Sequence, residues 1–166
     1  MVMLPEEREE NIIASLNTYL AANLPTGMSV EQVDFGGSGV QEEDHDEWLR
    51  ADVMITTPRY SRQVDQDGNM GSEPLVMFNV NIFRKQTVHE SDIYRLTKLG
   101  DELKNKFRVP LGIPVYDHEG SPSTRIGTLQ TYELNNEPMP FDQSKGIYGR
   151  NVTSTMRYVM KWEAPS

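Results

Sequence analysis

Three histidines, each beside a carboxylate, are the residues of this chain best suited to metal chemistry. They are His45 in "EEDHDE", His89 in "VHES" and His118 in "YDHEG". Imidazole and carboxylate groups that converge on one point bind zinc and similar ions. Each histidine falls in a predicted loop, however, and none has a second histidine four residues away on a helix. Solvated loop histidines are therefore the favoured interpretation, with a small metal-dependent enzyme as an alternative.

Other short motifs each lack a required residue. "DQDGN" begins like a calcium-binding loop, but an EF-hand needs glycine at position six and glutamate at position twelve. Counted from Asp65, those positions hold Met70 and Val76. "GGSG" lacks the lysine of a phosphate-binding loop, and "GSPST" lacks the pattern of a nucleophile elbow. The sequence therefore predicts no catalytic residue, no metal site and no cofactor.

Composition indicates a single domain over residues 1–166. The chain has 166 residues, of which 37% are hydrophobic, and no cysteine. Domains commonly hold about 100–200 residues, and a chain without cysteine has neither disulfides nor thiolate metal sites. The N-terminus carries acids where a signal peptide carries bases, and no apolar run approaches the roughly 18 residues of a membrane span. We therefore expect a soluble, cytoplasmic protein without a membrane segment.

The net charge of −9 is concentrated in the first part of the chain. Residues 1–50 hold 11 acidic residues against two basic ones, whereas residues 51–166 hold 14 of each. The run "QEEDHDE" supplies five of these acids: Glu42, Glu43, Asp44, Asp46 and Glu47. Such a surface repels nucleic acid, so we expect no sequence-specific DNA binding, although DNA could slide past it. The run is either a solvated loop or the lining of a channel.

Hydrophobic spacing predicts two helices, over residues 6–23 and 91–107. Apolar residues recur at helical spacing in both segments. The first stripe comprises Ile12, Ile13, Leu16, Tyr19 and Leu20, and the second comprises Ile93, Leu96, Leu99, Gly100, Leu103 and Phe107. A glycine within the second stripe predicts a close approach of that helix to a sheet.

Period-two alternation predicts strands in the rest of the chain. In "WLRADVMITT" and "LVMFNVNIF", apolar residues alternate with polar ones, which indicates antiparallel strands with one solvated face. Four more strands are expected in "MSVEQVDF", "IPVYD", "RIGTLQTYELN" and "NVTSTMRYVMKWE". The resulting order, α-β-β-β-α-β-β-β, predicts an α+β fold. We expect one mainly antiparallel mixed sheet with both helices packed on one face.

Two long excursions interrupt this pattern, at residues 58–74 and 135–150. A turn of two to five residues would join the strands on either side of the first one. Both excursions mix arginine, aromatic and methionine residues, which are enriched at protein interfaces. The interface candidates are Arg59, Tyr60, Arg62, Val64 and Met70 in the first, and Met139, Phe141, Ile147, Tyr148 and Arg150 in the second. We expect extended arms that reach neighbouring subunits; local disorder is the alternative.

The order of these segments resembles the tail terminator proteins of tailed bacteriophages, which complete the tail and join it to the head. The resemblance rests on the helix in "LPEEREENIIASLNTYLAANLP" and on the long loop between "WLRADVMITT" and "LVMFNVNIF". It extends to the helix "DIYRLTKLGDELKNKF" and the closing strand "STMRYVMKWE". It covers most of the chain and carries no invariant chemical motif.

The resemblance implies a structural virion protein of the tail or neck, made in the host cytoplasm, with no enzymatic activity. Such a protein forms a ring, usually a hexamer, on the last ring of the tail tube, and stops tube growth. It then meets the head connector or stopper protein, and the sheath where the tail is contractile, while DNA passes through its lumen. The acidic run 42–47 would face that lumen. Another neck, stopper or tube component is the closest alternative.

Overall fold

Helices and strands follow one another in the predicted order. The computed structural model describes residues 5–36, 44–56, 74–87, 91–109, 112–118, 120 and 124–160. The elements are α1 (Pro5–Ala22), the 3-10 helix η1 (Val30–Gln32), β1 (Val33–Phe35), β2 (Glu47–Thr56), β3 (Leu75–Lys85), α2 (Ser91–Phe107), β4 (Ile113–Tyr116), β5 (Arg125–Asp142) and β6 (Ile147–Met160). The predicted α+β order is confirmed.

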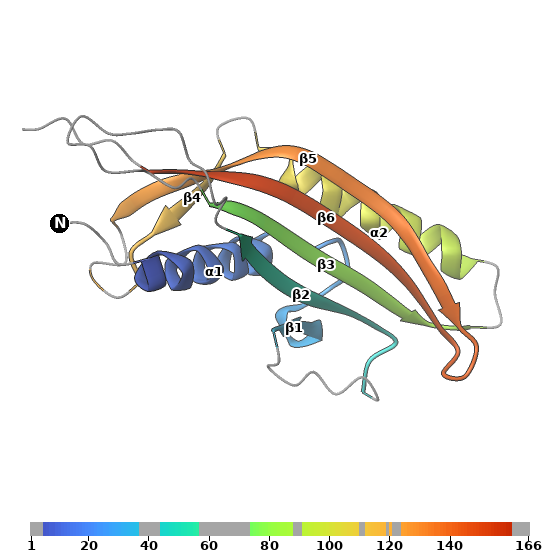
Figure 1. Ribbon diagram of the computed structural model, residues 1–166. Helices are drawn as coiled ribbons and strands as arrows, with labels where there is room; N and C mark the ends of the chain where they lie inside the picture. The colour runs from blue at the N-terminus through green and yellow to red at the C-terminus, as the bar shows by residue number, and fades with distance from the viewer. Residues whose placement is uncertain are drawn as a thin grey trace, which may run out of the picture.

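One curled six-stranded sheet contains all of these strands, in the spatial order β1-β2-β3-β6-β5-β4. The short β1 runs parallel to β2, and every other neighbouring pair is antiparallel. Figure 1 shows both helices on the same side of the sheet, behind it in that view. The mainly antiparallel mixed sheet with helices on one face is therefore confirmed. We call the opposite face the bare face.

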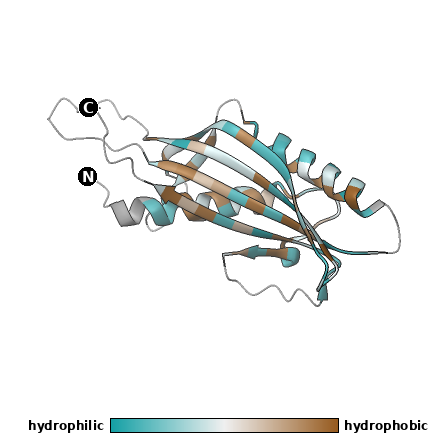
Figure 2. Ribbon diagram, turned by 45° about the vertical axis from the view of Figure 1, so that its right-hand side comes forward, coloured by the Kyte–Doolittle hydropathy of each residue, from teal (hydrophilic) through white to brown (hydrophobic). Residues whose placement is uncertain are grey.

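The core forms where the alternating strand residues meet the helix stripes. In β3, four alternate residues are fully buried: Val76, Phe78, Val80 and Ile82. Phe78 meets Phe107 of α2 edge to face, with ring centroids 5.3 Å apart. Hydrophobic and hydrophilic bands alternate along α2 in Figure 2, as an amphipathic helix requires. Two predicted core residues are wrong, because Ile13 and Ile93 are 38% and 59% exposed.

Neither helix of the described chain is long and apolar enough to span a membrane. Gly100 allows α2 to approach the sheet closely, as predicted. A Cβ atom at this position would lie 2.7 Å from Oδ1 of Asn136 and 3.0 Å from Cδ of Arg150. The absence of a side chain thus lets α2 settle directly on β5 and β6.

Helix α1 covers the edge strand β4 through two buried polar side chains. Asn11 Oδ1 accepts the backbone N–H of His118 at 2.9 Å, and Ser15 Oγ accepts that of Tyr116 at 3.0 Å. Asn11 and Ser15 are only 1% and 3% exposed. They stand four residues apart, so they share one helix face. Side chains of α1 therefore replace the strand partner that β4 lacks on this side.

The predicted strand in "MSVEQVDF" is shorter than expected, since only Val33–Phe35 is extended and η1 precedes it. Gln32 explains the difference. Its Oε1 accepts the backbone N–H of Ser29 at 2.9 Å, and its Nε2 donates to the backbone oxygen of Glu47 at 3.0 Å. Local side-chain bonds of this kind favour a turn over a strand.

The predicted extended loop at 135–150 is wrong, because β5 and β6 run through it as one long hairpin. That this segment reaches a neighbouring subunit stays a prediction. Asp142 organises its turn by accepting the backbone N–H groups of Ser144 and Lys145 at 3.0 and 3.2 Å. Gly146 closes the turn with a φ of +64°. The segment contains Pro138 and Pro140, which an edge strand tolerates, and β5 is such an edge beyond Leu129, where its pairing with β4 ends.

Replacement of Phe78 by aspartate is expected to abolish folding. The change forfeits about 3–5 kcal/mol of aromatic packing and buries an unpaired carboxylate, against a total stability of about 5–15 kcal/mol. Circular dichroism during heating should show no cooperative transition. Met54→Asp is the matched control on the same sheet, since Met54 is 54% exposed. A folded Phe78→Asp protein would contradict this assignment of the core.

Candidate assembly surfaces

The tip of the β5–β6 hairpin holds the second set of predicted interface residues. Phe141 and Tyr148 pack against each other with ring centroids 4.4 Å apart, and both are half-buried. Met139 and Ile147 are also half-buried. Arg150 differs, because its side chain points beneath α2 and donates a hydrogen bond to Asn136 Oδ1. The tip therefore presents an aromatic and aliphatic surface without Arg150.

An apolar row crosses four strands of the bare face near this tip. Trp48, Phe83, Gly149 and Met139 are successive register partners on β2, β3, β6 and β5. The rings of Trp48 and Phe83 stack with centroids 5.4 Å apart. A Cβ at Gly149 would lie 3.1 Å from Met139 Sδ and 3.5 Å from Phe83 Cδ1. Because Gly149 has no side chain, Met139 and Phe83 can approach each other over this position.

Uncharged polar side chains fill the centre of the bare face. Asn151 Nδ2 donates to Asn81 Oδ1 at 2.6 Å. The Thr153 hydroxyl lies 2.7 Å from Asn79 Oδ1 and 2.6 Å from Asn151 Oδ1. These groups satisfy one another, so the face is hydrophilic without carrying charge at its centre. Exposed charges of both signs surround that centre, namely Asp52, Glu133 and Glu137 and the arginines Arg50 and Arg157.

Glu47 does not belong to an exposed acidic surface, so the prediction that it faces a lumen is wrong. It lies opposite Arg84 in the sheet register, on the face that the helices cover. Its carboxylate accepts hydrogen bonds from Arg84 Nη1 and from Arg95 Nε, the latter at 3.1 Å. Arg84 Nε donates in turn to Asp92 Oδ1 at 2.7 Å. This network ties β2, β3 and α2 together at the hairpin end of the sheet.

Asp92 has a shifted pKa because of that network. Burial alone raises the pKa of this carboxyl, but hydrogen bonds from Arg84 and Thr87 and the charge of Arg84 outweigh burial, so the pKa lies below its ordinary value. For Arg84, burial lowers the pKa of the guanidinium, but its carboxylate partners Asp92 and Glu47 raise it by more. The pKa of Arg84 therefore lies above its ordinary value. Both groups are therefore held in their charged forms.

The other members of the acidic run keep their predicted exposure where the structure describes them. Asp44 and Asp46 are exposed and stand just before β2, at the hairpin end of the sheet. Glu42 and Glu43 lie outside the described residues. So do the interface candidates of the first excursion, Arg59, Tyr60, Arg62, Val64 and Met70.

The structure describes the strand residues on either side of that first excursion. Thr56 ends β2 and Leu75 begins β3, and the two residues are direct register partners. They lie at the end of the sheet opposite to the β5–β6 turn, because Leu75 pairs with Arg157 whereas Lys85 pairs with Ile147. The two excursions identified in the sequence therefore start from opposite ends of the same sheet.

The histidines do not converge. His45 precedes β2 at the hairpin end, whereas His118 follows β4 at the opposite end, beside α1. Fourteen residues of β6 separate these ends, which corresponds to roughly 40 Å. His89 lies outside the described residues, and those that are described include no group of three metal-ligating side chains. A site that uses both His45 and His118 is excluded by this geometry.

One contact that was not predicted above pairs a hydroxyl with an imidazole. Ser15 Oγ lies 3.2 Å from His118 Nε2, the arrangement of a nucleophile and its base. Ser15 is buried within α1 and already accepts the N–H of Tyr116. The contact therefore serves to dock α1 on β4. In the sequence, the polar residues Asn11 and Ser15 are four positions apart beside an apolar stripe, and this spacing could have indicated a polar contact of α1 with a neighbouring strand.

Two strand edges have no partner strand among the described residues. β1 accompanies β2 only from residue 49 to 51, which leaves residues 52–56 unpaired on that side. β4 accompanies β5 only as far as Leu129, which leaves the longer edge from residue 130 to the end of β5. Unpaired edges offer backbone donors and acceptors to another chain. Both are therefore candidate assembly surfaces.

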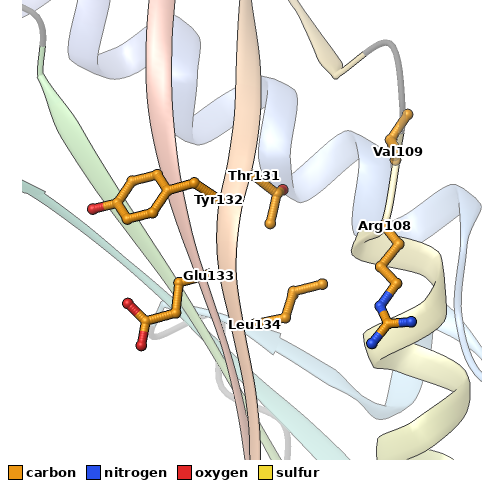
Figure 3. Close-up of a pocket in the computed structure, with 6 residues that line it drawn as sticks. All are labelled: Arg108, Val109, Thr131, Tyr132, Glu133 and Leu134. Atoms are coloured by element: carbon orange, nitrogen blue, oxygen red, sulfur yellow. The ribbon is translucent and has the colours of Figure 1, made fainter.

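An open groove lies beside the free edge of β5. Its volume is about 420 Å³, and it is lined by Arg108, Val109, Thr131, Tyr132, Glu133 and Leu134. The ladder between β5 and β6 shifts register between Thr131 and Glu133. Figure 3 shows Thr131 and Leu134 pointing towards Arg108 and Val109, while Tyr132 and Glu133 point away from them. The bulge therefore exposes side chains on both sides of the edge.

Comparison with known proteins shows the fold alone. No family model and no curated protein matches this chain. One of the solved structures that it resembles carries a sequence identifier instead of a descriptive name. That structure aligns with 99% of this chain and 100% of its own, at a TM-score of 0.54 and 14% sequence identity. The shared architecture thus extends over the whole length of both chains.

Asp92→Asn is expected to destabilise the protein at neutral pH by about 1.5–3 kcal/mol, the usual value of hydrogen bonds to a charged group. The folded pKa of Asp92 lies below its ordinary value of 3.8. Its contribution is therefore complete above that pH and is lost as the pH falls through the folded value. Urea unfolding at neutral and at acidic pH should show a shallower pH dependence for the variant.

The control for this measurement is Asp52→Asn, because Asp52 is exposed on the bare face. It should leave both the free energy of unfolding and its pH dependence close to those of the unchanged protein. Equal losses in the two variants would show that the network of Arg84 and Asp92 does not stabilise the fold.

Proposed function

We propose that this protein is a structural subunit that forms a ring on the end of a bacteriophage tail tube, ends tube growth and joins the tail to the head connector. The observation that carries the proposal is a curled sheet with both helices on one face and, among the described residues, a strand edge without a partner on each flank. A ring needs two different, complementary surfaces on each subunit. The edges of β2 and β5 supply two such surfaces.

The two ends of the sheet fit a subunit with a different partner above and below. The β5–β6 turn, with Asp44 and Asp46 nearby, occupies one end, and the anchors Thr56 and Leu75 occupy the other. A terminator meets the tube protein on one side and the connector or stopper protein on the other, with the sheath as a further partner in contractile tails. Strands that run along the ring axis would present one end to each.

The bare face suits the wall of a passage for DNA. Its centre is uncharged, with Asn79, Asn81, Asn151 and Thr153 bonded to one another. The exposed charges around that centre are Asp52, Glu133 and Glu137 against Arg50 and Arg157, and the whole chain carries a net charge of −9. An uncharged polar centre within a net negative chain retains the phosphate backbone only weakly. DNA would therefore pass through the lumen as cargo without tight binding.

The mass and shape of the purified protein test the proposal. Light scattering on a sizing column should give a mass that rises with concentration towards a defined multimer. Negative-stain microscopy should then show closed rings with a hole wide enough for duplex DNA, and added tube protein should promote them. A strict monomer at every concentration, even with tube ends present, would overturn the proposal.

Replacement of residues 60–72 by a tight turn should leave the fold intact and weaken assembly. The fold should survive because Thr56 and Leu75 are already register partners, which a short hairpin turn can join. Thermal unfolding should change little, while the multimer seen by light scattering should require higher concentrations. A glycine–serine segment of the original length is the control that separates length from side-chain content. Loss of soluble folded monomer would contradict the role of this segment in assembly.

A further inference from the structure

We infer that neighbouring copies join edge to edge, with residues 52–56 of β2 in one copy adding a strand to residues 130–135 of β5 in the next. The inference rests on the proposed ring and names the contact that builds it. Strand addition of this kind uses backbone hydrogen bonds for affinity and alternate side chains for specificity. The occupant of the groove beside β5 is then a second copy of this chain.

Among the described residues, the free edge of β5 forms a window of eight residues, 130–137, and the free edge of β2 forms a window of five, 52–56. On β5, the window begins where β4 stops, after Leu129. It ends before Pro138 and Pro140, which have no N–H to donate to a new strand. On β2, the window begins after Ala51, where β1 stops, and runs to Thr56 at the end of the strand. β1 itself ends at Phe35, and the next residue, Gly36, is in the left-handed region with a φ of +69°.

Strand direction is compatible with a ring. Three antiparallel steps lead from β2 through β3 and β6 to β5, so β2 and β5 run in opposite directions. Copies placed side by side in the same orientation therefore bring an antiparallel pair together. The same contact repeats at every junction, which is the heterologous arrangement that closes a ring.

Side chains on the bare face match across such a junction. Met54 is 54% exposed and Tyr132 is 59% exposed. Register pairs place Met54 in one cross-strand row with Met77, Thr155 and Glu133, directly beside the bulged Tyr132. Without a shift along the strands, the row of one copy continues into the next, and Met54 lies opposite Glu133 with the bulged Tyr132 beside it. Met54 would then cover part of the exposed ring of Tyr132.

The helix side matches in the same way. Val53 shares a row with Leu134, through Phe78 and Ser154, and Ile55 shares a row with Thr131. Val53 and Ile55 are only half-buried at their own edge. In the junction they would enter the groove formed by Thr131, Leu134 and Val109 of the next copy. The core of one copy would thereby continue into its neighbour.

Disulfide trapping tests this contact directly, because the chain has no cysteine of its own. The probe is the double variant Met54→Cys with Tyr132→Cys in the full-length protein. Within one chain, three strand spacings, about 14 Å, separate the two positions, and a disulfide needs Cα atoms about 4.4–6.8 Å apart. Any disulfide must therefore join different copies. Both positions are exposed, so the variant should fold normally.

Oxidation at high concentration should give a ladder of covalent multimers that ends at the ring number. The matched control is Met54→Cys with Tyr94→Cys, since Tyr94 is 74% exposed but lies on α2. The edge pair should give at least about ten times more cross-linked product than this control. Equal yields, or dimers alone as β5–β5 pairing would allow, would overturn the inference, because oxidation traps even transient contacts.

The same samples distinguish the inference from the proposed function. Rings visible by microscopy without cross-linking of the edge pair would overturn the edge contact and leave the ring proposal standing. A ladder without an upper limit, accompanied by open filaments, would support the edge contact and overturn the ring.

Discussion

The alternation of side chains along β3 is the constraint on which the rest of the structure depends. Its four inward residues are fully buried under the helices, and their neighbours Asn79 and Asn81 point to the bare face. A shift of one residue in register would exchange these two sets. Because β3 lies between β2 and β6, its alternation also determines which side chains of those two strands point to the helices and which point to the bare face. The burial of Glu47 and the apolar row through Trp48 both follow from it.

Much of the fold could be predicted from the sequence because the strongest signals are local. The helix stripes, the strand alternation and the close approach at Gly100 each depend on residues near one another in the chain. The hairpin was predicted as an extended arm because of its interface-type residues, and only the order of the sheet shows that β5 is an edge that tolerates Pro138 and Pro140. Glu47 was misread because its partners Arg84 and Arg95 lie far along the chain.

The candidate surfaces were harder to predict for a related reason. Trp48, Phe83, Gly149 and Met139 come from four strands and form a row only once the registers are known. The indole N–H of Trp48 is buried without an acceptor among the described residues, and no sequence pattern indicates that. By contrast, Asn11 and Ser15 carried a readable signal, since two polar residues at helical spacing adjoined a buried stripe.

The free edges have an energetic consequence for assembly. Helix α1 covers β4, and two prolines end the free edge of β5, so two windows remain open in the part of the sheet that the structure describes. Five cross-strand pairs contribute about 1–5 kcal/mol in total, whereas association costs about 4–15 kcal/mol in lost freedom. One junction therefore holds two free copies together only weakly, so free copies need a high concentration to assemble. A tube end that orients the copies removes most of the entropic cost, so the same weak edges can close a ring on the tube at lower concentration.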